Sequence, residues 1–302
     1  MSSLEGRVAI ITGAARGIGR EHALLMASEG ASVVVNDLGP ADSDGSSPAV
    51  SAAEMTAAEI RDLGGVAVAN TDNVASWDGG RRLVEQAVDT FGRLDILVNN
   101  AGILRDRFLV NMSEEEWDAV IHVHLKGHFV PLRFAAEHWK DQSKAGRDVA
   151  ASVINTTSTS GLHATPGQAN YGAAKSGIAT MTEIAAKELQ RYGVRVNAIA
   201  PAARTRLTTS TPALAERVAA PEDGAFDEWD PANISPLVAL LATEDCPITG
   251  KTFFVQGGKV GVYQSWTIAN SLSKPQRWTV TALREALAAV PEVNDGTIGS
   301  SL

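Results

Sequence analysis

Cysteine, long apolar runs and dense basic runs are almost absent from this chain of 302 residues. The single cysteine, Cys246, builds neither a disulfide framework nor a cysteine-based metal site, which suits a reducing cytoplasm. No apolar run reaches the roughly eighteen residues of a membrane helix, and the one near the N-terminus is too short for a signal segment. We therefore expect a cytoplasmic protein without a membrane span.

The charge balance is acidic, with 26 Lys and Arg against 35 Asp and Glu, a net charge of −9 and a pI of about 5.2. Because no run of basic residues occurs, we expect neither nucleic acid nor an anionic membrane surface as a partner. An anionic small-molecule substrate would need a local group of arginines instead. The hydrophobic share of 44% and the charged share of 20% are typical of a globular chain with a full core.

Short β-branched runs alternate with longer amphipathic stretches through most of the chain. Strands are expected at 7–13, 31–37, 64–70, 94–100, 151–158, 193–200 and 251–256. Near-continuous apolar strands separated by helices predict a parallel sheet that is covered on both faces. Right-handed crossovers then give a doubly wound α/β fold, which we expect as one domain over residues 1–258.

Three segments depart from this alternation. Residues 39–51 are rich in turn-forming residues and are expected to be a surface insertion. The segment 202–230 follows a strand end and is rich in Ala, Thr, Pro and acidic residues, which is typical of a mobile lid over a site. Residues 259–302 are too few to hold a core of their own, so we expect an extension docked on the domain or on a neighbouring subunit.

The sequence TGAARGIG, residues 12–19, joins the first expected strand to the helix that follows. Gly13 allows a tight turn, Gly17 lets the backbone approach a pyrophosphate, and Gly19 allows close packing of the helix. The N-terminus of that helix offers N–H groups and a partial positive charge to phosphates. The loop predicts a dinucleotide site, although a glycine cluster alone also fits a simple turn between strand and helix.

Asp37 lies about 20 residues further on, at the end of the second expected strand, as dinucleotide sites require. Its carboxylate can accept hydrogen bonds from the hydroxyls of an adenosine ribose and repels a 2′-phosphate, which favours NAD over NADP. Arg16 acts in the other direction, because a guanidinium near the glycine loop could pair with a 2′-phosphate. We expect NAD as the cofactor and keep NADP as the alternative.

Tyr171 and Lys175 lie on one face of a helix that is expected over residues 168–193. A free phenol titrates near pH 10, which is too high for a general base at neutral pH. A neighbouring ammonium stabilises the phenolate and lowers its pKa toward the working range. The pair therefore predicts an acid/base centre, and the alternative is a half-buried tyrosine beside a surface lysine.

Five ordered motifs make the sequence resemble the short-chain dehydrogenase/reductase family over about residues 5–258. They are the glycine loop, NNAG at 99–102, Ser158 followed by Tyr171 and Lys175, VNAIAP at 196–201, and GG at 257–258. The resemblance implies a single Rossmann-like domain. The cofactor contacts that it implies are Gly13, Arg16, Gly17, Ile18, Gly19, Asp37, Asp72, Asn73, Val74, Asn99, Ala101, Gly102, Tyr171, Lys175, Pro201 and Thr205.

The resemblance also implies a role for each catalytic residue. Tyr171 would exchange the proton of the substrate, Ser158 would hydrogen-bond the substrate oxygen, and Lys175 would hold the nicotinamide ribose and lower the Tyr171 pKa. Two positions depart from the family pattern. Ala202 stands where the family usually has Gly, with the spacing to Thr205 one residue shorter, and His124 stands where the family has a fourth catalytic residue, an Asn.

His124 and His128 are four residues apart in a helix expected over about residues 113–140, a spacing that also occurs in zinc sites. A catalytic zinc needs three protein ligands, and no third ligand is near in sequence, so we expect no metal site. By the resemblance, the imidazole of His124 would hold a water in the proton path from Lys175 to solvent. The alternative is that His124 only packs in the core.

Four segments, NDLG (36–39), NNAGILRDRF (99–108), VHLKGHF (123–129) and GQANYGAAK (167–175), resemble one branch of the family. This branch holds the dehydrogenase domain of peroxisomal multifunctional enzyme type 2 and its bacterial relatives, among them hydroxysteroid dehydrogenases. It implies NAD-linked oxidation of a (3R)-3-hydroxyacyl-CoA or a steroid alcohol, by a homo-oligomer, either a dimer or a tetramer.

Four arginines could meet the phosphates of coenzyme A or could simply form surface ion pairs: Arg105, Arg107, Arg204 and Arg206. Two other functions stay open. One is an NADPH-dependent 3-oxoacyl thioester (acyl-carrier-protein) reductase with the same catalytic residues, and the other is a non-catalytic NAD-binding regulatory protein.

Overall fold

The computed structural model describes residues 2–39, 51–206, 208–209, 212–222 and 224–294. The segment 39–51, which we expected to be a surface insertion, lies almost wholly outside these residues. The chain divides into two units, Met1–Val262 and Tyr263–Leu302, each described by itself. The first unit runs four residues beyond the expected boundary at 258, because the chain turns back at Gly257 and adds one more strand to the sheet.

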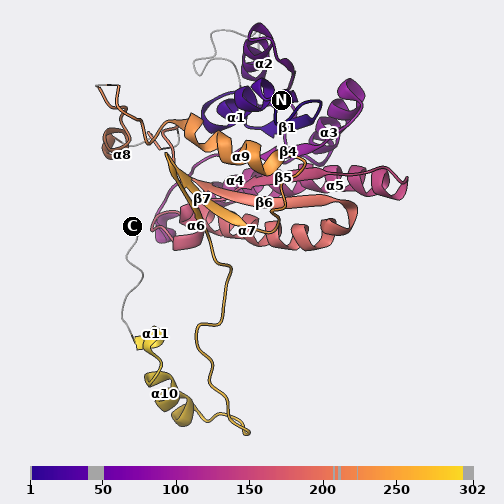
Figure 1. Ribbon diagram of the computed structural model, residues 1–302. Helices are drawn as coiled ribbons and strands as arrows, with labels where there is room; N and C mark the ends of the chain where they lie inside the picture. The colour runs from indigo at the N-terminus through magenta and orange to yellow at the C-terminus, as the bar shows by residue number, and fades with distance from the viewer. Residues whose placement is uncertain (1, 40–50, 207, 210–211, 223, 295–302) are drawn as a thin grey trace. The chain divides into compact units, whose positions relative to one another are not determined.

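The first unit holds one sheet of eight strands, several of which are labelled in Figure 1. They are β1 (Val8–Thr12), β2 (Ser32–Asn36), β3 (Val66–Asn70), β4 (Ile96–Asn99), β5 (Ala151–Thr156), β6 (Val194–Pro201), β7 (Thr252–Gln256) and β8 (Lys259–Val262). Their order across the sheet is β3-β2-β1-β4-β5-β6-β7-β8, and only β8 is antiparallel to its neighbour. The order reverses between β1 and β4, so the predicted doubly wound, Rossmann-like fold is confirmed.

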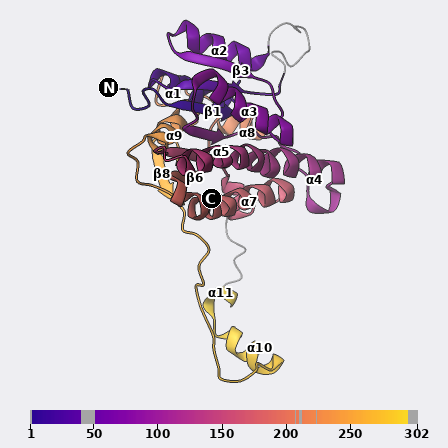
Figure 2. The same ribbon diagram turned by 90° about the vertical axis from the view of Figure 1, so that its right-hand side faces the viewer.

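Helices cover both faces of the sheet, as Figure 2 shows from the side of α5 and α7. The first face carries α1 (Gly17–Ser28), α2 (Ala52–Asp62) and α9 (Ser235–Ala242), and the second carries α3 (Trp77–Phe91), α5 (Gly127–Lys144) and α7 (Ala169–Leu189). Successive side chains of a strand point to opposite faces. In β1, Ala9 and Ile11 pack on the first face, whereas Val8 and Ile10 pack on the second. Both faces therefore bury apolar side chains of the same strands.

The segment expected as one helix over residues 113–140 is interrupted. It consists of α4 (Glu114–Ile121), a π-helical turn η2 (His122–Lys126) and α5. Ser113 starts α4 with a capping box, since its side chain accepts from the Glu116 N–H and the Glu116 carboxylate accepts in return. The π turn widens the helix by one residue at His124, and such turns occur frequently at functional sites.

Short elements complete the two units. In the first they are η1 (Leu109–Asn111), α6 (Thr159–His163), η3 (Gln190–Tyr192), α8 (Pro212–Arg217) and η4 (Pro231–Ile234). The second unit contains α10 (Val280–Ala288), capped by Thr279, and α11 (Pro291–Asn294). Its docking on the domain or on another subunit stays a prediction. Within the part of the chain that the structure describes, no helix is long and apolar enough to cross a membrane.

Candidate active site

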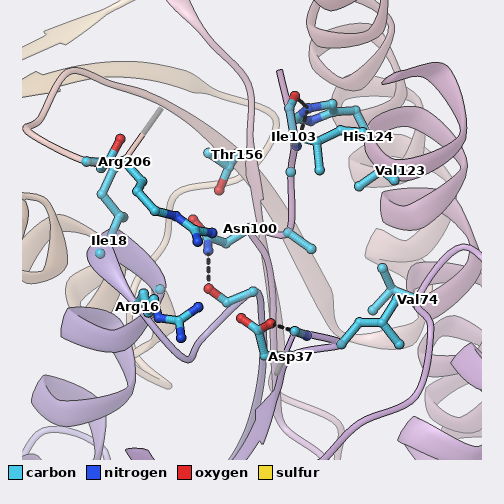
Figure 3. A pocket seen from close by; sticks show the side chains of 18 of the residues that line it. Arg16, Ile18, Asp37, Val74, Asn100, Ile103, Val123, His124, Thr156 and Arg206 are labelled. Carbon is cyan, nitrogen blue, oxygen red and sulfur yellow. Dashed lines mark hydrogen bonds between the residues drawn. The ribbon is translucent and has the colours of Figure 1, made fainter. Parts of the chain in front are cut away.

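A cavity of about 520 Å³ opens at the carboxyl ends of the strands. Open α/β sheets bind ligands at this edge, where the strand order reverses. All of the expected cofactor contacts line the cavity except Asn99, and so does His124. Figure 3 shows Arg16 and Asp37 at one end of the cavity and His124 with Ile103 at the other. We call these the nucleotide end and the reaction end.

The glycine loop at the nucleotide end has the shape that a pyrophosphate requires. Gly13 and Gly17 have φ values of 62° and 54°, in the left-handed region that favours glycine. A Cβ at Gly19 would lie 2.2 Å from the Gly13 carbonyl oxygen, so only glycine fits there. Helix α1 begins at Gly17, and the first three residues of this helix, Gly17 to Gly19, line the cavity, as an anion site at a helix N-terminus requires. Thr205 packs across Gly17, since a Cβ there would lie 3.6 Å from the Thr205 side chain.

Asp37 follows β2 directly and is held by backbone groups. One carboxylate oxygen accepts from the Gly39 N–H at 2.8 Å and the other from the Ala15 N–H at 3.2 Å. Asp72, Asn73 and Val74, which follow β3, line the same end of the cavity. The carboxylate therefore lies beside the glycine loop, where the residues fit the adenosine ribose of a dinucleotide.

Asn99 differs from the expectation, and Asn100 takes the place at the cavity. The side chain of Asn99 is fully buried and donates to Asn155 Oδ1 at 3.0 Å. Asn100 lines the cavity, and its Nδ2 donates to the Thr12 and Gly13 carbonyl oxygens at 3.0 and 3.1 Å. Asn99 is buried because side chains alternate along β4: Leu97 points to the second face, so Asn99 points there too. Asn100, the next residue, turns toward the glycine loop.

Lys175 and Tyr171 extend from α7 into the reaction end. Lys175 is 2% exposed, and its Nζ donates to the Thr156 carbonyl oxygen at 2.6 Å and lies 5.5 Å from the centre of the Tyr171 ring. Burial lowers the pKa of Lys175 from 10.5 to about 7. The Thr157 hydroxyl holds this turn of α7 by donating to the Lys175 carbonyl at 2.6 Å. The amine is therefore placed to change its protonation near neutral pH.

The pKa of Tyr171 is raised rather than lowered, because burial of the phenol outweighs a hydrogen bond with the Ser158 side chain. Lys175 is not among the causes of this shift, so the structure does not show the predicted lowering of the Tyr171 pKa by Lys175. Ser158 does not line the cavity itself. It caps α6, where its hydroxyl accepts from the Ser160 N–H at 3.2 Å, and it reaches the reaction end through Tyr171.

His124 is wedged between Tyr171 and the turn after β4. Its ring meets the Tyr171 ring edge-on, with centroids 5.1 Å apart, and its Nε2 lies 2.7 Å from the Ile103 carbonyl oxygen. A Cβ at Gly102 would lie 2.3 Å from the imidazole, so glycine is required at that position. Burial and, second, the charge of Lys175 lower the pKa of His124 to about 3, which keeps the ring neutral.

The Nε2 of His124 either donates to the Ile103 carbonyl oxygen at 2.7 Å or accepts from the Ile103 N–H at 3.1 Å, depending on the tautomer. In both tautomers the buried Nδ1 has no partner among the described residues. A buried polar group without a partner costs about 1–3 kcal/mol, so this nitrogen is suited to hold a water. Within the described ranges, no group of three or more His, Cys, Asp or Glu side chains could hold a metal ion.

The four arginines separate into two kinds. Arg107 pairs with Glu116 and Arg204 with Asp227, while Arg105 donates to the Leu104 carbonyl oxygen at 2.8 Å. Arg206 alone of the four lines the cavity (Figure 3). The sequence does not distinguish Arg206 from the other three arginines, because ion pairs between distant residues leave no signal in the sequence.

Known dehydrogenases are similar to this chain over most of its length. The family model for short chain dehydrogenases matches residues 7–216. Hydroxyacyl-CoA dehydrogenase ChsB1 of Mycobacterium tuberculosis is 44% identical over 262 residues, which cover 86% of this chain and 80% of that protein. Peroxisomal multifunctional enzyme type 2 of Mus musculus is 43% identical over 257 residues, which cover 85% of this chain and 32% of that protein.

Among solved structures, the crystal structure of a short chain dehydrogenase from Mycobacterium avium matches with a TM-score of 0.84 and 49% identity, covering 95% of this chain and 94% of that one. The family model spans well over half of the chain, and the cavity has the glycine loop and the Tyr171–Lys175 pair. The chain belongs to the short-chain dehydrogenase/reductase family and is an NAD(P)-dependent oxidoreductase that acts on CH–OH groups.

Proposed function

We propose that the protein oxidises the secondary alcohol of a (3R)-3-hydroxyacyl-CoA or a hydroxysteroid with NAD. The observation that carries the proposal is the single cavity that joins Asp37 at one end to Tyr171, Lys175 and His124 at the other. Of the two substrate classes, the acyl-CoA is supported by the relative named hydroxyacyl-CoA dehydrogenase and by Arg206 in the cavity lining. The steroid alcohol rests on the resemblance to the branch.

In the proposed reaction the chain holds the substrate and moves one proton. Ser158 donates a hydrogen bond to the substrate oxygen. The phenolate form of Tyr171, which has to form against the raised pKa of this residue, takes the hydroxyl proton as the C–H bond breaks. NAD, when bound, accepts the hydride. Lys175 holds the nicotinamide ribose and passes the proton onward, for which a pKa of about 7 is suitable. His124 holds the water that receives it, in place of the asparagine of the family.

The preference for NAD rests on Asp37. Its carboxylate is fixed by two backbone N–H groups, so it cannot easily turn away from a 2′-phosphate placed at the ribose. Arg16 also lines the nucleotide end and is the residue that could favour NADP. Titration of the protein with NADH and with NADPH tests this point, and tighter binding of NADPH would favour the 3-oxoacyl thioester reductase instead.

Formation of NADH tests the substrate proposal, with (3R)-hydroxyacyl-CoA esters and hydroxysteroids offered in parallel. No turnover with either class would refute it.

The variant Arg206→Ala tests whether this arginine binds the coenzyme A part of the substrate. If it binds coenzyme A, the variant raises KM for the acyl-CoA several-fold and leaves KM for the matching acyl-pantetheine and the affinity for NADH unchanged. Arg107→Ala is the matched control, since Arg107 is paired with Glu116 and lies outside the cavity lining.

We also propose a homo-oligomer, either a dimer or a tetramer. Trp117 on α4, Phe129 on α5 and Ile184 on α7 are 39%, 45% and 50% exposed, so these neighbouring helices present apolar side chains to solvent. A second copy could bury them. Light scattering that gives the mass of a monomer at micromolar concentration would refute this.

A further inference from the structure

Buried polar atoms without hydrogen bonds gather near the amine of Lys175. Seven buried side-chain nitrogen and oxygen atoms lack a partner among the described residues, and five of them belong to Asn99, His124, His128 and Thr156. His128 stands out, because both of its ring nitrogens lack a partner although the residue is fully buried. Nothing in the proposed reaction so far uses it.

These residues are neighbours in space. Asn99 and Asn155 are paired in the sheet, and Asn99 Nδ2 donates both to Asn155 Oδ1 and to the His128 carbonyl oxygen, at 3.0 and 3.3 Å. Thr156 comes next in β5, and its carbonyl oxygen accepts from Lys175 Nζ at 2.6 Å. The ends of β4 and β5, the π turn, the start of α5 and α7 thus bring Asn99, His124, His128 and Lys175 together, whereas the Thr156 side chain follows Ile154 to the first face of the sheet and lines the cavity.

The donors and acceptors in this group complement one another. Both partners of the Asn99 amide nitrogen are oxygens, which fixes its NH₂ toward them and leaves Oδ1 as an acceptor. An ammonium has three donors, and the Thr156 carbonyl uses one of those of Lys175. The unpartnered side-chain atoms make no hydrogen bonds of normal geometry with each other, although the carbonyls of His124 and Thr156 lie near the His128 ring. Ordered water is the partner that satisfies them together.

Burial and, second, the neighbouring charges keep the ring of His128 neutral. Burial and then the charges of Lys175 on α7 and His124 on η2 hold the His128 pKa well below its usual 6.5, although the nearby carbonyls of His124 and Thr156 act in the opposite direction. A neutral imidazole has one donor and one acceptor. It can therefore accept from one water and donate to another without carrying charge into the site.

We propose that His128 is a positioning residue of the proton path and, with His124, holds water against the amine of Lys175. The inference rests on the proposed function. The substrate O–H bond breaks, its proton passes to Tyr171 and through Lys175 to this water, and the hydride leaves with NAD. No other oxidant is needed. His128 acts only through the water and Lys175 and does not touch the substrate.

Two variants of His128 and one matched control test this. His128→Phe keeps a flat ring and removes both nitrogens, whereas His128→Gln returns one donor and one acceptor. His22→Phe is the control, because His22 is equally buried but packs between α1 and α9 on the other face, where it bonds Ser235. Kinetics with an established alcohol substrate are measured in H₂O and D₂O, together with NADH affinity by fluorescence.

We expect His128→Phe to lower kcat about tenfold, below the 10²–10⁴ of a group that transfers the proton itself. The solvent isotope effect on kcat should rise, because proton movement becomes slower, while KM and NADH affinity stay unchanged. His128→Gln should recover most of kcat and restore the isotope effect. His22→Phe should alter neither. If His128→Phe does not fold, as judged by lost NADH binding, His128→Leu takes its place.

The outcomes are distinguishable. No turnover by the wild-type protein refutes the proposed function and this inference with it. Turnover by the wild-type protein, with kcat and isotope effect unchanged in His128→Phe, refutes this inference alone and makes His128 a packing residue. Equal losses in the Phe and Gln variants without a change in isotope effect also refute it. An atomic-resolution crystal structure of the NAD-bound protein adds a test without substrate, since it must show water between His128 and Lys175.

Discussion

The two ends of the cavity differ in how their polar groups are satisfied. At the nucleotide end, Asp37 and Asn100 are each held by two hydrogen bonds to backbone groups. At the reaction end, burial lowers the pKa of Lys175 to about 7 and that of His124 to about 3, and the His124 Nδ1 has no partner among the described residues. An end whose polar side chains already have hydrogen-bond partners is suited to binding a ligand in a fixed position. An end with shifted pKa values is suited to proton transfer.

Tyr171→Phe gives the largest effect that this comparison predicts. Removing the hydroxyl should lower kcat by about 10³-fold, within the range for a general acid or base, while NADH affinity changes little because the nucleotide end is intact. Stopped-flow kinetics and fluorescence titration measure the two quantities. Retained turnover would show that another group takes the proton, whereas lost turnover in a variant that still binds NADH excludes a purely regulatory NAD-binding protein.

The variant Asp37→Ala removes the carboxylate at the nucleotide end instead. A hydrogen bond to a charged group contributes about 1.5–3 kcal/mol, so NADH affinity should fall roughly 10- to 100-fold. NADPH affinity should rise, because the carboxylate no longer repels the 2′-phosphate. At saturating NAD, kcat should stay within about twofold of the wild type, since the reaction end is untouched. The same loss of affinity for both cofactors would mean that Asp37 only supports the loop through Ala15 and Gly39.

Gly102→Ala disturbs the reaction end through packing. The added Cβ would lie 2.3 Å from the His124 ring, and such overpacking typically costs about 1–3 kcal/mol of unfolding free energy. Gly258→Ala is the control, since its Cβ would meet nothing within 4 Å and its φ is not in the left-handed region. Urea unfolding measures the free energy of unfolding of both variants. Adding His124→Ala to Gly102→Ala should recover part of the loss, and no recovery would show that the clash lies elsewhere.

The difference between the ends also explains what the sequence could predict. The fold and the glycine loop follow from local rules: alternation of strands and helices, and glycine at positions where a side chain has no room. Asp37 follows from its distance to that loop. The register of Asn99 and Asn100 was also present in the sequence, because counting by twos from Leu97 puts Asn99 on the second face. The family motif nevertheless led us to expect Asn99, and not Asn100, at the cavity.

The reaction end depends on contacts that the sequence does not contain. The π turn at His124 interrupts a segment whose sequence is compatible with one continuous helix. The burial of Lys175 and the wedge of His124 against Gly102 arise from packing between α7, the π turn and the turn after β4. The raised pKa of Tyr171 is the result of the same burial, and no spacing rule could have given its direction.

Acid sensitivity involves one buried histidine at the reaction end, His124, and one outside the cavity, His22. In the unfolded chain a histidine takes up a proton as the pH falls through about 6.5, whereas in the folded protein His22 and His124 have pKa values of about 3. The unfolded state thus binds more protons between these values. The free energy of unfolding must therefore fall as the pH falls below 6.5, by up to about 1.4 kcal/mol per pH unit for each histidine.

Urea unfolding at pH 7, 6 and 5 measures this slope, and His22→Gln or His124→Gln should each reduce it by about the contribution of one histidine. Equal slopes in wild type and variants would show that these imidazoles are not held neutral by the fold. The two variants should differ in turnover, however. Only His124 packs on Tyr171 and lies near Lys175, so a lower kcat confined to His124→Gln would separate the cost of burying an imidazole from its use in the proton path.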